Sequence, residues 1–460
     1  MDPERCENYG PHLPPGSARE ANLDLRARNL PWFARRARKE YAGHLAWLVG
    51  SVYKLKRIRG GLFSPSFSHR GHLSVKQPVK NNMAKVTVRE ARFDEKDLAG
   101  ILTVLRQVLA VPYSACSFID FVRMFNHKWL DNPARTRDHV FGWVVDSPTD
   151  GIVGFVGQVP VRIKIGEREI VGACGSSYGV LPAYRGYSLM LYKQLIDWGD
   201  KHFLVFTTAN RMSSKINETM GLNKTPISDI SRKLLWLLRP EVGVNWALRE
   251  SKRKVWHRLT EQFPGAYLLK GVARVWFVRH RRLKIKCPKL AVEPVVSFTK
   301  EFDDLWENNK KDYAITTVRD QAFLTWRHLR VTNVIGRTFV FACRDNGQMR
   351  GYIALQARSH ESGYLRGHYV ATDLFYERTR KDVLYNLMNH AFEFAKTHGC
   401  SIFEASDYSN EVAEELTTQR PYVRSDESCS YWYKGLTNIT ADLNDDKAWW
   451  PSGADGDSNL

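Results

Sequence analysis

The sequence has few cysteines and no long apolar run. Its seven cysteines are scattered over 460 residues, with no Cys-x-x-Cys pair and no histidine cluster at metal-ligand spacing. We therefore predict no zinc site and no metal cofactor. Scattered thiols suit a reducing compartment. No window approaches the apolar length of a membrane span, and the first residues do not resemble a signal peptide, because charges interrupt their apolar core. These absences favour a cytoplasmic protein.

The sequence is rich in positive charge, and this charge is unevenly placed. The formal net charge is +19, of which residues 1–82 carry +9 and residues 231–290 carry +13. The remaining residues sum to −3. The cationic character therefore belongs to two segments and not to the folded units beside them.

The first cationic segment, residues 1–82, contains no clear strand and is predicted to be a poorly ordered N-terminal extension. An alternative is a basic amphipathic helix over residues 31–59, which would attach to an anionic membrane surface or to nucleic acid. Domain-like sequence begins directly after Met83, so Met83 competes with Met1 as the start of the protein.

The second cationic segment, residues 231–290, interleaves tryptophans with arginines and lysines. Such interleaving suits phosphates, stacked bases or the headgroup region of a bilayer. It predicts peripheral contact with an anionic membrane, at its inner face, or with tRNA. The alternative is a linker followed by closing strands whose aromatic rings pack inward while the cations face water.

Residues 83–230 alternate between strand-like and helix-like patterns. The predicted order is strand, two helices, three antiparallel strands, helix, strand and helix. The clearest of these elements lie near residues 86–91, 98–109, 118–129, 139–145, 152–160, 170–180, 185–199 and 203–208.

The element order is organised around the stretch Val180-Leu-Pro-Ala-Tyr-Arg-Gly-Tyr-Ser-Leu-Met190. It joins a strand to an amphipathic helix expected to begin near Arg185 or Gly186, where free backbone N–H groups would point at a bound anion. This stretch resembles the acyl-CoA-binding motif of the GNAT superfamily of N-acyltransferases, Val-x-Pro-x-Tyr-Arg-Gly-x-Gly-x-Gly/Ala. Ser188 and Met190 depart from the glycines of that motif, and we expect Met190 to narrow the cradle.

The resemblance implies an α/β fold with a mixed sheet, and an acyl-CoA, in the simplest case acetyl-CoA, as co-substrate. In many members a tyrosine four residues before a downstream glycine protonates the leaving thiolate. Here that glycine is Gly221 and the tyrosine's position holds Asn217. Tyr178, beside the expected thioester, is the second catalytic candidate. The implied donor-binding residues are Val180, Leu181, Arg185, Gly186, Tyr187, Ser188, Leu189, Met190 and Asn210.

Several candidates also have simpler interpretations. Tyr178 fits a core aromatic, and Asn210 fits a helix cap. Glu167 and Glu169 lie one hairpin away and are either candidate bases or turn residues. Cys174 has no neighbour expected to lower its pKa, so it fits a small buried hydrophobe better than a nucleophile.

The element order repeats over residues 291–437, which predicts two tandem GNAT-like domains. The second copy is degenerate, because residues 373–379 stand where the phosphate-binding glycines would be. Tandem copies with a Phe-Leu-x-Trp-Arg segment, here Phe323 to Arg327, resemble FemAB-type transferases and the two-domain GNAT proteins found with bacterial surface-polysaccharide genes. The acidic and polar stretch 438–460 is predicted to be a flexible tail.

Three functions follow from these patterns. The first is an acyl-CoA-dependent N-acyltransferase that moves an acyl group, in the simplest case acetyl, to an amine of a small molecule or of a sugar or cell-envelope precursor. The second is a catalytically degenerate tandem-GNAT scaffold that docks on anionic membrane, which Ser188, Met190 and Asn217 favour. The third is a FemAB-like transferase whose donor is an aminoacyl-tRNA.

Overall fold

The protein is described by a computed structural model, in which residues 85–109, 113–114, 116–227, 232–239, 280–329, 336–358, 367–406, 408–425, 430–435 and 441–457 are placed. All of them belong to one compact unit, Asn82–Leu460. The expectations for residues 1–82 and for most of 231–290 lie outside the described residues. The expectations of membrane or tRNA contact therefore stay predictions.

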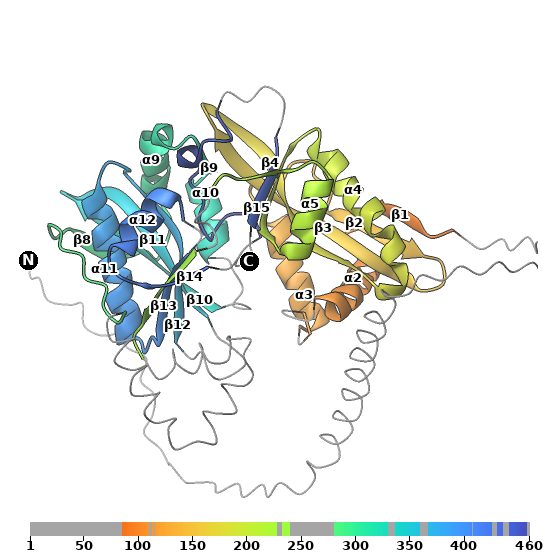
Figure 1. Cartoon of the computed structure of the whole chain (residues 1–460), viewed down its shortest axis with the longest axis horizontal. Helices are drawn as coiled ribbons and strands as arrows, with labels where there is room; N and C mark the ends of the chain where they lie inside the picture. Colours follow the sequence, from red (N-terminus) through yellow and green to blue (C-terminus); the bar gives the residue numbers. More distant parts are fainter. Residues whose placement is uncertain are drawn as a thin grey trace, which may run out of the picture. The chain divides into compact units, whose positions relative to one another are not determined.

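A mixed sheet forms the first half of this unit (Figure 1). Its neighbouring strands are antiparallel, except that β4 and β5 run parallel. In spatial order the sheet contains β1 (Thr87–Glu90), β2 (Gly142–Ser147), β3 (Gly151–Ile165), β4 (Arg168–Val180), β5 (Phe203–Ala209), β15 (Ser430–Lys434) and β6 (Asn223–Lys224), and β9 (Ile315–Thr317) pairs with β3.

A second mixed sheet repeats this arrangement. Its only parallel pair within the described strands is β12 with β13, which takes the place of β4 with β5. In spatial order it contains β8 (Ala291–Pro294), β10 (Gly336–Asp345), β11 (Gln348–Arg358), β12 (His368–Tyr376), β13 (Ile402–Ser406), β7 (Arg232–Leu237) and β14 (Tyr422–Ser425). The predicted doubling of the element order is therefore confirmed in this part of the chain.

The two halves exchange one strand each. β15 comes from the end of the chain but lies between β5 and β6, and in Figure 1 it is the blue strand beside the yellow and green ones. β7 precedes the second half but lies between β13 and β14. The predicted boundaries need this correction, since β15 was assigned to the second domain and β7 to the linker. Trp236 on β7 is fully buried, as the closing-strand interpretation of its segment requires.

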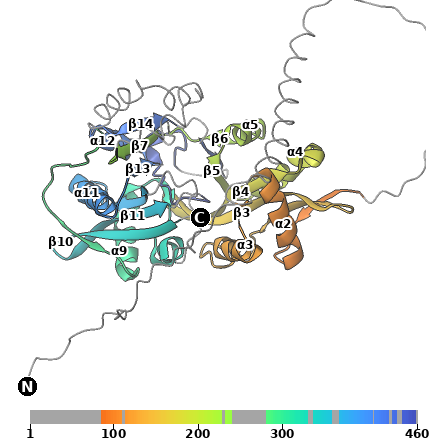
Figure 2. The same cartoon turned by 90° about the horizontal axis from the view of Figure 1, so that it is seen from below.

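Helices cover both faces of the first sheet (Figure 2). α2 (Glu95–Val108) and α3 (Phe118–Phe125) pack with Phe155 on one face. α4 (Ser188–Gly199) and α5 (Arg211–Thr219) pack with Val156 and Phe206 on the other. α3 continues directly into a π-helix, Asn126–Leu130. The sequence places a polar N-cap before each helix of the first pair, because the Asp94 and Ser117 side chains accept from the N–H groups of Asp97 and Asp120.

The second sheet carries corresponding helices. They are α9 (Lys300–Asn309), α10 (Gln321–Leu324) with a following π-helix Thr325–Leu329, α11 (Lys381–Thr397) and α12 (Asn410–Thr417). The longest, α11, buries Val383, Leu387 and Ala391 against the sheet at helical spacing. No helix among the described residues is both long and apolar enough to cross a membrane.

The end of the chain packs into the unit, which corrects the prediction of a flexible tail for residues 438–460. Within the described range 441–457, Trp449 and Trp450 are 6% and 3% exposed, and Ser452 is fully buried. The Trp450 N–H donates to the Ile315 carbonyl at 2.8 Å. The acidic composition led to the prediction of a flexible tail, although the segment contains two large aromatic side chains. Burial of each of these side chains stabilises the segment by about 2 kcal/mol.

Candidate active site

Strands β4 and β5 diverge part-way along their length. They pair over three positions, from Gly172 to Cys174 on β4. Beyond Cys174, β4 continues to Val180 and β5 to Ala209 with no further pairing between them. This leaves a V-shaped gap at the carboxyl ends of two parallel strands, where ligands commonly bind in α/β sheets. We refer to it below as the β4–β5 gap.

A bulge bends β4 beside this gap. One residue separates Phe155 from Gly157 on β3, whereas Ser177 and Tyr178 both lie between their partners on β4. Ser177 has a φ of +56°, which residues other than glycine seldom adopt. Its hydroxyl lies 2.9 Å from the Tyr113 hydroxyl. Because a bulged residue leaves the ladder, its main-chain groups are available to a ligand in the gap.

Tyr178 joins the bulge to the start of α4. Its hydroxyl donates to the Ser188 carbonyl at 3.2 Å, and its ring meets the Tyr192 ring edge-on with centroids 4.9 Å apart. Burial raises the pKa of Tyr178, and the hydrogen bond to Ser188 only partly opposes this. The phenol therefore stays protonated at neutral pH and can donate a proton but cannot serve as a base.

The predicted phosphate cradle is a solvent-facing helix start. Pro182–Tyr187 forms a 3-10 helix that passes into α4. Arg185 and Gly186 are exposed, and a Cβ added to Gly186 would meet nothing within 4 Å. Met190 is 55% exposed, so its side chain points to solvent and the expected narrowing is wrong. The Ser188 N–H already donates to the Arg185 carbonyl.

The remaining predicted donor residues surround this helix start. Val180 is buried and Leu181 and Tyr187 are half-buried in the same hydrophobic cluster as α4. Leu189 is 52% exposed.

The two predicted asparagines make structural contacts. Asn210 is the N-cap of α5, and its Oδ1 accepts from the N–H groups of Met212 at 2.9 Å and Ser213 at 3.1 Å. Asn217 is fully buried and accepts a hydrogen bond from the Tyr192 hydroxyl. A side chain without exposed surface does not reach a leaving thiolate. The catalytic role predicted for Asn217 is therefore corrected to support of Tyr192.

The other candidates near β4 also have structural roles. Glu169 accepts from the indole of Trp306 at 3.2 Å and pairs with Lys310 at 3.3 Å. Glu167 lies in the exposed turn between β3 and β4. Cys174 is fully buried, and burial raises the pKa of its thiol, so it is a packed hydrophobe.

A carboxylate that the sequence did not single out lies in the β4–β5 gap. Asp457 Oδ1 accepts from the hydroxyls of Thr207 at 3.2 Å and Thr208 at 3.1 Å, and the Cys174 thiol lies 3.7 Å away. Adjacent strand residues point to opposite faces, so contact with both threonines places Asp457 at the β4-facing edge of β5. Gly456, at φ +61°, makes this approach possible, because a Cβ there would lie 2.6 Å from the Cys174 sulfur.

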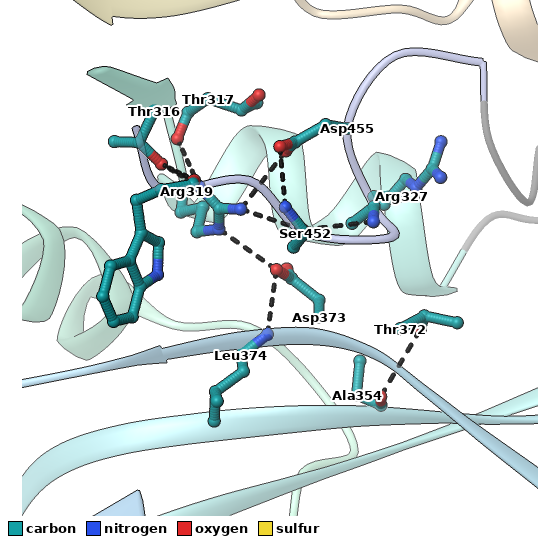
Figure 3. A network of polar contacts seen from close by, with 12 residues as sticks. Thr316, Thr317, Arg319, Arg327, Ala354, Thr372, Asp373, Leu374, Ser452 and Asp455 are labelled. Atoms are coloured by element: carbon teal, nitrogen blue, oxygen red, sulfur yellow. Dashed lines mark hydrogen bonds and ion pairs between the residues drawn. The ribbon is translucent and has the colours of Figure 1, made fainter. Parts of the chain in front are cut away.

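Buried arginines hold the segment that carries Asp457 (Figure 3). Arg319 donates to Asp373 at 3.1 Å, to Ser452 at 2.9 Å and to Asp455 at 3.2 Å. Arg327 donates to the Gly453 and Gly456 carbonyls. Burial lowers the pKa of Arg327 to about 10, so its guanidinium remains charged at neutral pH.

Comparison with protein-family models and with curated protein sequences found no match. Solved structures do match. An N-myristoyltransferase of Saccharomyces cerevisiae with bound myristoyl-CoA and inhibitors aligns over 84% of this chain and 91% of its own, with a TM-score of 0.50 and 10% identity. A GCN5-related N-acetyltransferase from Anabaena variabilis aligns over 76% of this chain and 72% of its own, with a TM-score of 0.49 and 13% identity. A probable N-acyltransferase from Enterococcus faecalis aligns over 77% of this chain and 73% of its own, with a TM-score of 0.48 and 10% identity.

The chain shares the fold of this N-myristoyltransferase structure. At these identities the likeness concerns the fold alone. It confirms the predicted α/β class with two mixed sheets.

In the second sheet the parallel strands β12 and β13 also stop pairing before their ends, after Ala371 and Ala405. β12 carries a bulge at Thr372, between the partners of Ala354 and Leu355, which corresponds to the bulge at Ser177. There the following residue, Asp373, is fully buried and bound by Arg319, His328 and Tyr352. A charged network thus lies at the bulge of the second sheet, whereas the segment that carries Asp457 lies beside the bulge-bearing strand of the first. Among the described residues no group of three or more side chains has the types needed to hold a metal ion.

Proposed function

We propose that the protein is an acyl-CoA-dependent N-acyltransferase, with the donor in the β4–β5 gap of the first sheet. The observation that supports this most is the Asp457 carboxylate, held by Thr207 and Thr208 where the two strands diverge. The fold supports acyl transfer in general, since solved structures that share it include acyltransferases. The acceptor class and the acyl group are the finer parts of the proposal.

The donor's diphosphate would lie at the start of α4. Arg185 is exposed there and has no ion-pair partner within the described residues, and Gly186 leaves the backbone open to close approach. The helix dipole favours an anion at this end. Ser188 contributes less than the sequence suggested, because its N–H is satisfied by Arg185.

Each step of the transfer has a candidate group in the gap. The amine nitrogen attacks the thioester carbonyl, a C–N bond forms, and the C–S bond breaks as the thiolate leaves. Asp457 is the candidate to accept the amine proton. Main-chain N–H groups at the Ser177 bulge are the candidates to stabilise the negative carbonyl oxygen. Tyr178, protonated at neutral pH, is the candidate to protonate the thiolate.

The size of the adjoining cavity favours a short acyl group. A largely apolar cavity of about 30 Å³ lies beside Thr207 and Gly456 and is lined by Val161, Val205 and Trp449. It has room for about two water-sized groups. Acetyl and propionyl groups fit this space without rearrangement, whereas a long fatty chain requires the segment around Trp449 to move.

Calorimetric titration of acetyl-CoA tests the donor site. We expect binding to the wild type and weakened binding to R185E and to G186E. Gly186 faces open space, so a new carboxylate there acts by repelling phosphate and not by disturbing the fold. No binding of acetyl-CoA or propionyl-CoA to the wild type would overturn the proposal.

Two observations favour the scaffold alternative. The Ser188 N–H, expected to bind phosphate, donates to the Arg185 carbonyl, and Asn217 is buried. Two results together would support the membrane-docking scaffold. The protein would show no transfer activity, and it would sediment with anionic liposomes only when residues 231–290 are present. Release of free CoA in the presence of an amine acceptor would exclude it. The aminoacyl-tRNA alternative predicts salt-sensitive tRNA binding.

A further inference from the structure

A second cavity lies behind the β4 bulge, on the α3 side of the sheet. It is lined by the aromatic rings of Phe125 and Trp129 and by four polar side chains, Lys128, Gln158, Ser176 and Ser177. Its volume is about 10 Å³, which is room for one water-sized group. Because Ser176 and Ser177 belong to the bulge, the cavity borders the place where the proposed function puts the thioester.

Gln158 brings an unsatisfied acceptor to this cavity. Its Nε2 donates to the Val140 carbonyl, which fixes the orientation of the amide because a carbonyl cannot pair with Oε1. Gln158 is 4% exposed, and its Oε1 has no partner within the described residues. A buried acceptor without a partner costs about 1–3 kcal/mol. An N–H or O–H donor from outside the chain would remove that cost.

Lys128 brings an amine donor to the same cavity, which its side chain lines. The residue is 8% exposed. The charged groups that act on it are Asp457 and Arg327, and burial lowers its pKa. The nitrogen carries N–H donors in either protonation state. A buried lysine is seldom retained without a partner.

The two groups together define the missing ligand atom. A water-sized group in this cavity can donate to Gln158 Oε1 and accept from Lys128, and a hydroxyl does both. A carboxylate would accept from Lys128 but repel Gln158 Oε1. An ammonium would donate to Gln158 Oε1 but offer no acceptor to Lys128. The lining aromatic rings suit the apolar C–H surface next to such a hydroxyl.

We propose that this cavity binds a hydroxyl of the acceptor, and that the acceptor is an amine with a hydroxyl on the carbon beside its amino group, as in amino alcohols and amino sugars. This inference rests on the proposed function, since it places the neighbouring nitrogen at the bulge, whose Ser176 and Ser177 line the cavity. Lys128 and Gln158 are then specificity-determining residues.

Three cyclic amines of matched size test the proposal: trans-2-aminocyclohexanol, cyclohexylamine and 1-aminocyclohexanecarboxylate. Calorimetry on the full chain, with and without acetyl-CoA, should show at least tenfold tighter binding of the aminocyclohexanol to the wild type. In K128M and in Q158L that preference should fall below threefold. K164M is the matched control, because Lys164 is equally buried but donates to the Gly166 and Tyr313 carbonyls away from the cavity. Its preference should stay unchanged.

The outcomes separate this inference from the proposed function. Equal binding of aminocyclohexanol and cyclohexylamine, or preference for the carboxylate, would overturn the hydroxyl site even if acetyl-CoA binds. No binding of any of the three amines would also overturn it, since a water molecule alone then satisfies Lys128 and Gln158. Absence of acetyl-CoA binding, with the aminocyclohexanol preference intact, would overturn the proposed function and leave the hydroxyl site standing.

Discussion

The rings of His127 and Trp326 stack with their centroids 5.3 Å apart, and the Trp326 indole donates to the His127 carbonyl at 2.8 Å. Each residue lies in a π-helix that follows the second helix of its half. The next residues, Lys128 and Arg327, are both buried basic side chains. The two halves therefore meet through equivalent turns, and each turn carries a buried basic side chain.

This contact predicts that the halves unfold together. Trp326 is 4% exposed, so W326A should remove about 3–5 kcal/mol of stability, as expected for a buried tryptophan. Urea unfolding followed by far-ultraviolet circular dichroism should show one transition in the wild type and one, at lower urea, in W326A. Two separate transitions in the wild type would contradict cooperative unfolding. I119A, which truncates a side chain that is 69% exposed, should change stability by less than about 0.5 kcal/mol.

Asp457 gives a test of catalysis that is separate from donor binding. D457N keeps the shape and can still interact with Thr207 and Thr208, but its amide cannot accept the amine proton. We expect the turnover number to fall by about 10²–10⁴-fold while the calorimetric affinity for acetyl-CoA changes by less than threefold. D442N, in the exposed part of the same segment, is the control and should keep full turnover. A D457N protein with wild-type turnover would exclude Asp457 as the base.

The sequence predicted the elements that depend on local pattern. The β4 strand, the helix that follows it and the doubled order all carry periodicity or turn residues within about 20 residues, so they could be recognised without a structure. The junction of β4 with the following helix was also predicted, because the Val180 to Gly186 stretch resembles a known motif. Glu167 and Cys174 behave as their simpler interpretations required, whereas Glu169 lies in β4 and not in a turn.

What the sequence could not provide were contacts between distant segments. Asp457 meets Thr207 across about 250 residues, and no periodicity links an acidic end to a strand edge. The exchange of β7 and β15 could not be predicted either, because a strand pattern does not specify which sheet the strand joins. Lys128 did carry a weak signal, since it and Arg327 follow equivalent helices in the two halves.

The strand exchange predicts that the first half does not fold by itself. Residues 83–230 lack β15, so β5 and β6 would lose the strand that separates them and expose their edges. We expect this fragment to be insoluble, or to lack cooperative unfolding, when expressed alone. Coexpression with residues 231–460 should restore a soluble complex. A soluble, cooperatively unfolding fragment 83–230 would show that β15 is dispensable.

The buried pair of His328 and Asp373 predicts a pH dependence of stability. Burial lowers the pKa of His328, although Asp373, 3.2 Å away, opposes this. In the unfolded chain the pKa of a histidine is about 6.5. Below that pH the unfolded chain binds a proton that the folded His328 does not, so stability falls as the pH decreases, by up to about 1.4 kcal/mol per pH unit.

H328Q isolates this contribution, because the glutamine amide can still donate to Asp373 but does not titrate. When the pH is lowered from 7.5 to 5.5, the urea midpoint of unfolding should fall further in the wild type than in H328Q. H139Q serves as the comparison, since burial also lowers the pKa of His139 but that residue lies beside Gly172 and away from Asp373. If the wild type and H328Q lose the same stability, the pKa of His328 does not differ between the folded and the unfolded protein. If the wild type loses less stability than H328Q, the folded His328 is protonated and forms an ion pair with Asp373. Asp373 would then help to hold the Asp457 segment in a pH-dependent manner, because the same carboxylate binds Arg319.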